Sequence, residues 1–291
     1  MKVRIGGQAV VEGVMMRSDN FISTTVRDEK KQLKNRTRPF NSITEKNKFL
    51  GLPFVRGVFM LFELMVLGLK EISWSAENSS NEEPLSKKEM IITFAISILL
   101  VLSIFVLLPW FLANVLMTGS LLGVNILDGV IKILLFIGYL VAISLLPDVK
   151  RLYEYHGAEH KVVACFESKQ KLTPKNAQKF SRLHPRCGTT FVFVVFIIGI
   201  LVYLLVPLSL GFWGNYGVRI LLLPVIAGLS YELIRLEGKY YNKSRLVRLL
   251  IWPGIQFQKL TTRNPSLEQL GVAINSLEEC IKAEKKLQKV K

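Results

Sequence analysis

The sequence predicts a mainly α-helical, polytopic membrane protein with four transmembrane helices and a small cytoplasmic α+β layer. Half of its 291 residues are hydrophobic, and the mean hydropathy is +0.35. Four apolar stretches approach the roughly 20 residues that a helix needs to cross a bilayer. The whole surplus of positive charge, +16, lies outside these stretches, which is typical of a membrane protein with cationic aqueous surfaces. We therefore do not expect a simple soluble enzyme.

The N-terminal residues 1–52 are expected to form a cytoplasmic region that contains strands. Residues 21–40 place β-branched and aromatic side chains on both sides of a charged DEKKQ segment, which is typical of a β-hairpin. Residues 53–72 follow as an interfacial or re-entrant helix, because their apolar stretch is short and has Glu63 at its middle. The alternative is a fifth, tilted crossing, which would move the basic N-terminal region outside, against the positive-inside rule.

Two transmembrane hairpins are expected, at 90–146 and 191–234. Their four spans are 90–113, 127–146, 191–210 and 217–234. Lys132, Arg219 and Glu232 fall near span ends, where charged side chains can reach the interface. The loops expected at 114–126 and 211–216 contain no Lys or Arg, whereas the loop 147–190 carries nine, against four acidic residues. The positive-inside rule therefore places 147–190 and both termini in the cytoplasm.

The C-terminal residues 235–291 are expected to form a basic cytoplasmic tail with an amphipathic helix. Ser266 and Gln269 resemble a capping box, and apolar residues follow at helical spacing, namely Leu267, Leu270, Ile274, Leu277 and Ile281. We expect this apolar face to pack on the protein's own cytoplasmic layer. Arg245 and Arg248, followed by an apolar segment, are expected to contact anionic lipid headgroups.

All three histidines of the chain lie in the 147–190 segment, in two motifs. The motif HGAEH at 156–160 places two imidazoles four residues apart, hence on one face of a helix, in the H-x-x-E-H order of inverted zinc peptidases. His184 and Cys187 have the three-residue spacing of metal-binding turns, and a cytosolic thiol stays reduced. We expect Zn²⁺ bound by some subset of His156, His160, His184 and Cys187. Hydrogen-bonding histidines and a small core cysteine are the ordinary alternative.

The number of ligands decides what such a metal site does. Three protein ligands leave a position for water, and Glu159 would then act as the catalytic base of a hydrolase. Four ligands close the tetrahedron and make a structural clip that holds the segment together. The sequence is compatible with both arrangements.

Two further polar groups are candidates for functional roles. The glycine-rich segment 6–17 contains Gln8, Glu12 and Arg17; the last two could pair or face a ligand, or the segment could be a tight turn leading into a strand. Glu232 and Arg235 lie three residues apart on the last span. We expect them to anchor that helix, with the lining of a polar cavity as the alternative.

Five segments of the chain resemble the YqhQ-type family of bacterial membrane proteins, a group of unknown function described as predicted metal-dependent enzymes. They are GGQAVVEGVMMR at 6–17, YHGAEHKVVACFE at 155–167, HPRCGTTF at 184–191, GLSYELIR at 228–235 and TTRNPSLEQLGVAI at 261–274. The resemblance extends over nearly the whole chain. It implies a multi-pass protein of the bacterial cytoplasmic (inner) membrane, and its metal dependence is itself inferred from motifs.

Three classes of function follow from these observations. The first is a metal-dependent hydrolase at the cytoplasmic face, with a substrate that the sequence does not identify. The second is a non-catalytic, oligomeric scaffold or assembly protein with a structural metal. The third is a channel or transporter, which would need a homo-oligomer because polar residues along the spans are sparse. Membrane topology accounts for the basic charge, so we expect the lipid bilayer as partner and no nucleic acid.

Overall fold

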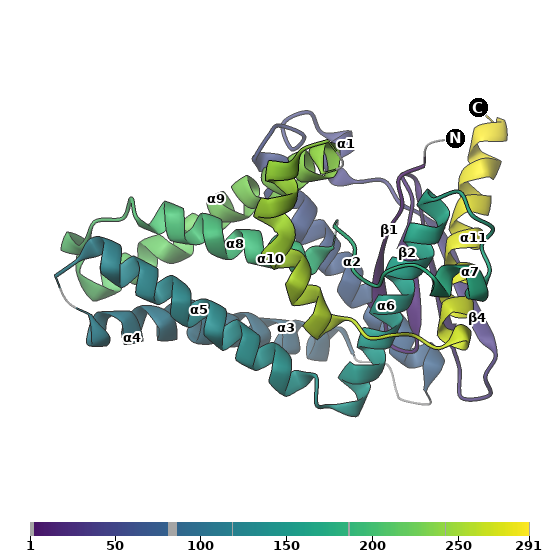
Figure 1. The fold of residues 1–291 in the computed structure, drawn as a ribbon, viewed down its shortest axis with the longest axis horizontal. Coiled ribbons are helices and arrows are strands. Elements are labelled where there is room, and N and C mark those ends of the chain that lie inside the picture. The colour runs from purple at the N-terminus through teal and green to yellow at the C-terminus, as the bar shows by residue number, and fades with distance from the viewer. Residues whose placement is uncertain (1–2, 81–85, 118, 186, 242, 291) are drawn as a thin grey trace.

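The computed structural model describes residues 3–80, 86–117, 119–185, 187–241 and 243–290. Within them the chain is mainly helical and contains one four-stranded antiparallel sheet. A long helical bundle forms one end of the molecule, and a layer built around the sheet forms the other (Figure 1). Both termini lie in the sheet layer (Figure 1).

The sheet is a meander whose strands follow one another in space as in sequence. The strands are β1 (Gly6–Val10), β2 (Gly13–Arg17), β3 (Phe21–Arg27) and β4 (Leu33–Pro39). The last two confirm the hairpin expected at 21–40. The turn between β1 and β2 holds Glu12 at a positive φ of 51°. A side chain at Gly13 would lie 2.2 Å from the carbonyl oxygen of Thr25, so only glycine fits there.

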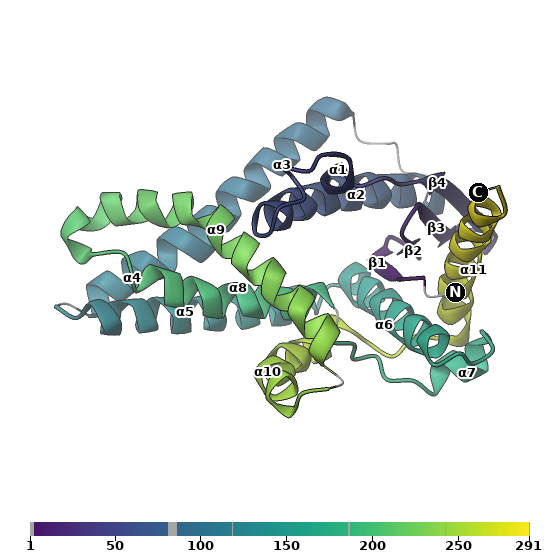
Figure 2. The ribbon, with the colours of Figure 1, turned by 90° about the horizontal axis from the view of Figure 1, so that it is seen from above.

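The sheet lies between two helical layers (Figure 2). α2 (Val55–Ser79) covers one face, and α6 (Pro147–Glu167) with α11 (Leu267–Val290) covers the other. Successive residues of a strand point to opposite faces of the sheet, so alternate residues belong to two separate hydrophobic cores. Val10, Met15, Ile22 and Val26 pack with Leu67 of α2, whereas Val14 and Met16 pack with Tyr155, Ala158, Leu270 and Leu277. Helices thus cover both faces of the sheet, although β4 at its edge has no buried residue.

α11 begins with the capping box that the sequence predicts. The backbone N–H of Ser266 donates to Oε1 of Gln269 at 2.8 Å, and the N–H of Gln269 donates to Oγ of Ser266 at 3.1 Å. Its apolar face packs on the sheet and on α6. The expectation that this face serves the protein's own layer is therefore confirmed.

The bundle contains three helices that are long and apolar enough to cross a membrane. They are Lys88–Leu116, Leu121–Ile143 and Leu208–Leu236. The first consists of α3 (Lys87–Leu102), a π-helical turn η1 (Ser103–Leu107) and α4 (Leu108–Leu116); the others are α5 (Leu121–Ile143) and a 3-10 turn η2 (Leu208–Leu210) continued by α9 (Gly211–Tyr240). The span expected at 191–210 corresponds to α8 (Gly188–Tyr203), an apolar helix of only 16 residues. The described residues thus indicate membrane association with three spans of full length.

The described residues of the short loops expected at 114–126 and 211–216 are largely helical. Their polar side chains bond to the backbone of their own helices instead of marking loops. Asn125 Nδ2 donates to the carbonyl of Leu121 at 2.9 Å, and Asn215 Nδ2 donates to that of Gly211 at 3.1 Å. Ser120 caps α5 by accepting from the N–H of Gly123 at 3.1 Å. The helices therefore extend further than the apolar runs suggest.

Two basic residues of the spans also differ from expectation. Lys132 and Arg219 do not reach an interface; both are buried and both bind Oδ2 of Asp128, at 2.6 and 2.7 Å. A buried carboxylate removes the need to extend either side chain to water. The charge near these span ends is therefore internal.

The remaining helices lie against the bundle and the sheet layer. They are α1 (Ile43–Lys46), α7 (Pro174–Gln178) and α10 (Arg245–Thr261). α10 packs against α8, and its apolar residues Leu246, Leu249, Leu250 and Trp252 are exposed. α2 is longer than the helix expected at 53–72; one face lies on the sheet, and the opposite face exposes Phe59, Phe62 and Met65.

Candidate metal centre

α6 carries the HGAEH motif as one continuous helix. His156 and His160 lie on the same face, with ring centroids 4.4 Å apart. The chain that leaves α10 crosses α6 at Gly157, where an added Cβ would lie 2.0 Å from the carbonyl oxygen of Arg263. The glycine of the motif therefore allows the segment after α10 to approach the two histidines.

Each of the two histidines has its Nδ1 bonded to a backbone carbonyl. Nδ1 of His156 lies 2.8 Å from the oxygen of Thr261, and Nδ1 of His160 lies 2.6 Å from the oxygen of Arg182. A carbonyl oxygen only accepts, so Nδ1 carries the proton in both rings and Nε2 keeps its lone pair. Metal-ligating histidines are typically oriented in this way.

Cys187 completes a group of three potential ligands. It is the N-cap of α8, and its Sγ lies 3.3 Å from Nε2 of His156. The ligand atoms of His156, His160 and Cys187 all lie within 4.8 Å of one another. With bond lengths of about 2.0–2.3 Å, the ligands of a tetrahedral zinc ion lie about 3.5 Å apart. A modest closure would therefore fit one ion.

His184 lies beside this group. Its ring centroid is 5.8 Å from that of His160, and its Nε2 lies 3.5 Å from Oε2 of Glu167. The side-chain amide of Gln258 holds its backbone: Oε1 accepts from the N–H of His184 at 2.8 Å, and Nε2 donates to its carbonyl at 2.7 Å. Among the described residues, His184 stands outside the three-residue ligand group. Arg186 of the same motif lies outside the described residues.

Burial affects the pKa of two histidines, His160 and His184. It lowers the pKa of His160, and the hydrogen bond with Cys187 and the charge of that residue only partly oppose this effect. Burial also lowers the pKa of His184, opposed by the charge of Glu159. Neutral imidazole is the form that binds metal, so the environment favours the competent state.

Glu159 lies between the histidines and the sheet. It is buried, and burial raises the pKa of its carboxyl group, while His156 and His184 oppose the rise. A Cβ at Gly7 of β1 would lie 2.9 Å from Cγ, Cδ and Oε1 of Glu159. Gly7 of the N-terminal motif thus provides the space for this carboxyl group.

The other N-terminal candidates lie away from the three ligands. Gln8 faces α2, where a Cβ at Gly68 would lie 2.8 Å from its Oε1. Glu12 sits in the β1–β2 turn and accepts from Arg151 Nη2 at 2.6 Å. Arg17 lies at the opposite end of β2, over the ring of Phe40 at 4.3 Å. Glu12 and Arg17 therefore do not pair, because they lie at opposite ends of β2. The alternative, a tight turn that leads into a strand, describes this segment.

Glu232 anchors its helix through a different partner than expected. It accepts from Nε and Nη2 of Arg56, at 2.7 and 2.5 Å, and from the backbone N–H of Phe54 at 3.3 Å. These bonds tie α9 to the start of α2. The anchoring role is therefore present, with Arg56 in place of Arg235.

Sequence reasoning missed several residues that hold the candidate centre. They are Gly7, Arg182, Gln258 and Thr261. Two of them act through backbone carbonyls, which leave no residue-type signal. The repeated glycine at 6–7 was the one available clue.

Fold and site together define a mainly helical protein with three candidate membrane spans, in which α6 and the start of α8 bring two histidines and a cysteine to one point. The chain belongs to the family described as "Protein of unknown function (DUF1385)", which matches residues 52–283. It is 35% identical over 298 residues to "Uncharacterized protein YqhQ" of Bacillus subtilis (strain 168), covering 96% of this chain and 92% of that protein. No solved structure matches the chain. The resemblance to the YqhQ-type family is confirmed over most of the chain; these descriptions name no reaction or metal.

Proposed function

We propose that the protein is a Zn²⁺-dependent hydrolase that acts at the cytoplasmic face of the bacterial inner membrane. The observation that carries the proposal is the three-residue group of His156, His160 and Cys187 with Glu159 beside it. Two imidazoles and one thiolate form a donor set that zinc favours. The orientation of both imidazoles by backbone carbonyls supports a prepared site.

Three protein ligands leave one coordination position for a reacting molecule. A bound Zn²⁺ would supply a Lewis acid there and lower the pKa of water. Glu159, three residues after His156 on α6, would accept the proton that water loses and return it to the leaving group. Gly7 and the β1 strand would hold this carboxyl group in place. His184 would lie at the edge of the metal site, outside the group of three ligands.

The location at a membrane surface is supported by α10. Its exposed apolar residues and its Arg245 and Arg248 suit contact with lipid and anionic headgroups. The same helix ends at Thr261, whose carbonyl oxygen fixes the ring of His156. The candidate centre would therefore lie next to a helix suited to the interface.

The test replaces zinc by Co²⁺ and asks whether one coordination position is open. We expect absorption bands of a tetrahedral Co²⁺ thiolate site in the purified protein, and a change in these bands when acetohydroxamate is added. Glu159→Gln should leave the bands unchanged and weaken acetohydroxamate binding about tenfold, because the amide cannot take the proton of the hydroxamate.

His184→Gln distinguishes the hydrolase from a structural clip. In the open site this variant keeps the Co²⁺ spectrum of the wild type. A spectrum that is insensitive to acetohydroxamate and altered in His184→Gln would contradict the hydrolase and support the scaffold with a closed metal site.

A further inference from the structure

The helical bundle contains a buried charge cluster far from the candidate metal centre in sequence. Asp128 and Lys132 lie one turn apart on α5, and Arg219 comes from α9. Arg219 donates to Oδ2 of Asp128 at 2.7 Å and to Oδ1 of Asn125 at 2.5 Å, and Lys132 donates to the same Asp128 oxygen at 2.6 Å. Aromatic rings enclose the cations: Arg219 lies 4.0 Å from the ring centroid of Trp110.

This cluster contains two cationic side chains but only one carboxylate, so it carries one surplus positive charge. Two cations share a single carboxylate oxygen, and the other oxygen of Asp128 has no hydrogen-bond partner within the described residues. Nε of Arg219 is equally unsatisfied in that part of the chain. An uncompensated charge among apolar helices is costly, so a bound monoanion would stabilise the cluster.

An elongated cavity of about 530 Å³ begins at this cluster. Lys132 and Tyr203 lie at one end, and the wall along α8 extends back to Val192. Eleven residues of helix separate Tyr203 from Val192, which corresponds to about 16 Å. Apolar side chains and η1 form most of the remaining wall. The cavity therefore combines a cationic end with a long apolar channel.

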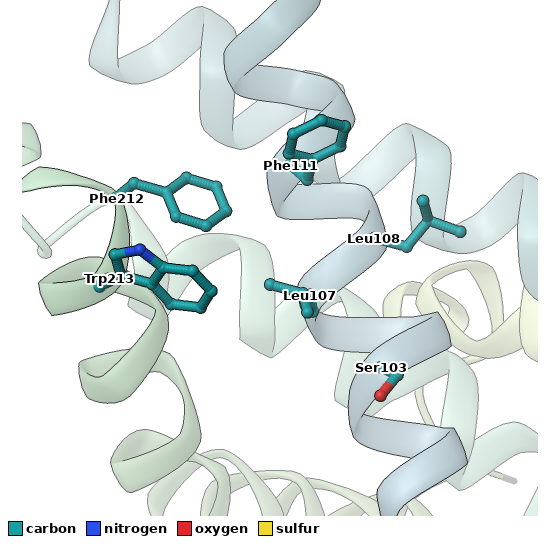
Figure 3. A pocket seen from close by; sticks show the side chains of 6 residues that line it. All are labelled: Ser103, Leu107, Leu108, Phe111, Phe212 and Trp213. Atoms are coloured by element: carbon teal, nitrogen blue, oxygen red, sulfur yellow. The ribbon is translucent and has the colours of Figure 1, made fainter.

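A second cavity has a similar volume but no charged residue in its lining. It measures about 520 Å³ and lies between η1, α4 and the start of α9. Figure 3 shows its lining of Leu107, Leu108, Phe111, Phe212, Trp213 and Ser103, none of them charged. Such a cavity suits an apolar chain alone, whereas the cavity at Lys132 can also hold an anionic group.

We propose that the cavity at Lys132 binds a monoanionic amphiphile with one long acyl chain. The head would lie at the ammonium group of Lys132, which donates to Asp128 alone in the described structure and so has donors to spare. The chain would extend along α8 past Gly199 toward Val192. One negative charge on the ligand matches the one surplus positive charge of the cluster.

The test measures saturable binding of radiolabelled oleate to the full-length protein by scintillation proximity in neutral detergent. Oleate should bind at about one molecule per chain, and oleyl alcohol, which lacks the charge, should compete at least about tenfold less well. Lys132→Met should weaken oleate binding at least about tenfold. It leaves Asp128 balanced by Arg219, so the bundle should remain intact.

A second pair of variants tests the channel. The atoms nearest to a Cβ at Gly199 would be 3.9 Å away, so the position has room for a side chain. Gly199→Leu therefore places its side chain into the cavity and should block oleate binding. Gly138→Leu is the matched control, because Gly138 is exposed on α5 and has nothing within 4 Å of its Cβ position. Equal competition by oleate and oleyl alcohol, or unchanged binding in Lys132→Met, would overturn the proposal.

Discussion

Replacing Gly7 with alanine should disturb the candidate metal centre through a close contact with Glu159, which no sequence motif predicts. The new Cβ would lie 2.9 Å from three atoms of Glu159. Ordinary contacts begin near 3.4 Å, so the buried carboxyl group must retreat by about 0.5 Å. Overpacking of this kind costs about 1–3 kcal/mol in the free energy of unfolding.

Gly6 provides a matched control one residue away on the same strand. A Cβ at Gly6 meets nothing within 4 Å, so Gly6→Ala should change the free energy of unfolding by less than about 0.5 kcal/mol. Thermal unfolding of the purified variants measures the difference, at roughly 2–4 °C per kcal/mol for a chain of this size. Gly7→Ala should therefore unfold clearly below Gly6→Ala.

A double-mutant cycle identifies Glu159 as the cause. Combined with Glu159→Ala, which removes the colliding atoms, Gly7→Ala should cost much less than it does alone, with an interaction energy of at least about 0.5 kcal/mol. Equal melting temperatures for the two glycine variants, or strictly additive effects in the cycle, would refute the close approach of β1 to Glu159.

Two further predictions concern the contacts of α2. Burial alone would raise the pKa of Glu71, but hydrogen bonds from Thr24, Arg36 and Arg38 lower it below its ordinary value. The stability contributed by the Glu71 carboxylate is therefore present above pH 4.5 and is lost as pH falls through the lower pKa of the folded state. When unfolding is measured as a function of pH, the free energy of unfolding of Glu71→Gln should fall less at acidic pH than that of the wild type. Arg56→Ala should lower the free energy of unfolding by about 1–2 kcal/mol, because it removes the ion-pair partner of the Glu232 carboxylate. Arg235→Ala should have little effect. Thermal unfolding that ranks the two variants in the opposite order would contradict the contact between α2 and α9.

Local patterns were the most informative part of the sequence. The hairpin at 21–40 follows from two β-rich runs around a charged turn, and the capping box of α11 follows from Ser266 and Gln269. The position of His156 and His160 on one side of α6 follows from the period of a helix, because residues four positions apart lie on the same face. Each of these features depends on residues close together in the chain.

Tertiary pairing accounts for what the sequence did not reveal. Glu12 and Arg17 are close in sequence, but an extended strand separates them by about 16 Å at 3.3 Å per residue. Asp128 and Arg219 are 91 residues apart, so their bond depends on the tertiary arrangement of α5 and α9, which both pack against α8. The carbonyl groups that orient the histidines carry no side-chain signal. Cys187 joins the ligand group only because the start of α8 lies over α6.

The metal content of the purified protein, measured by elemental analysis after purification without chelators, tests the central claim most directly. We expect about one zinc ion per wild-type chain and loss of that zinc in Cys187→Ser. Cys165→Ser is the matched control, because Cys165 is a buried cysteine of α6 that lies outside the ligand group, and it should keep its zinc. Zinc-free wild-type protein that fails to bind added Zn²⁺, or equal zinc content in the two cysteine variants, would contradict the metal centre.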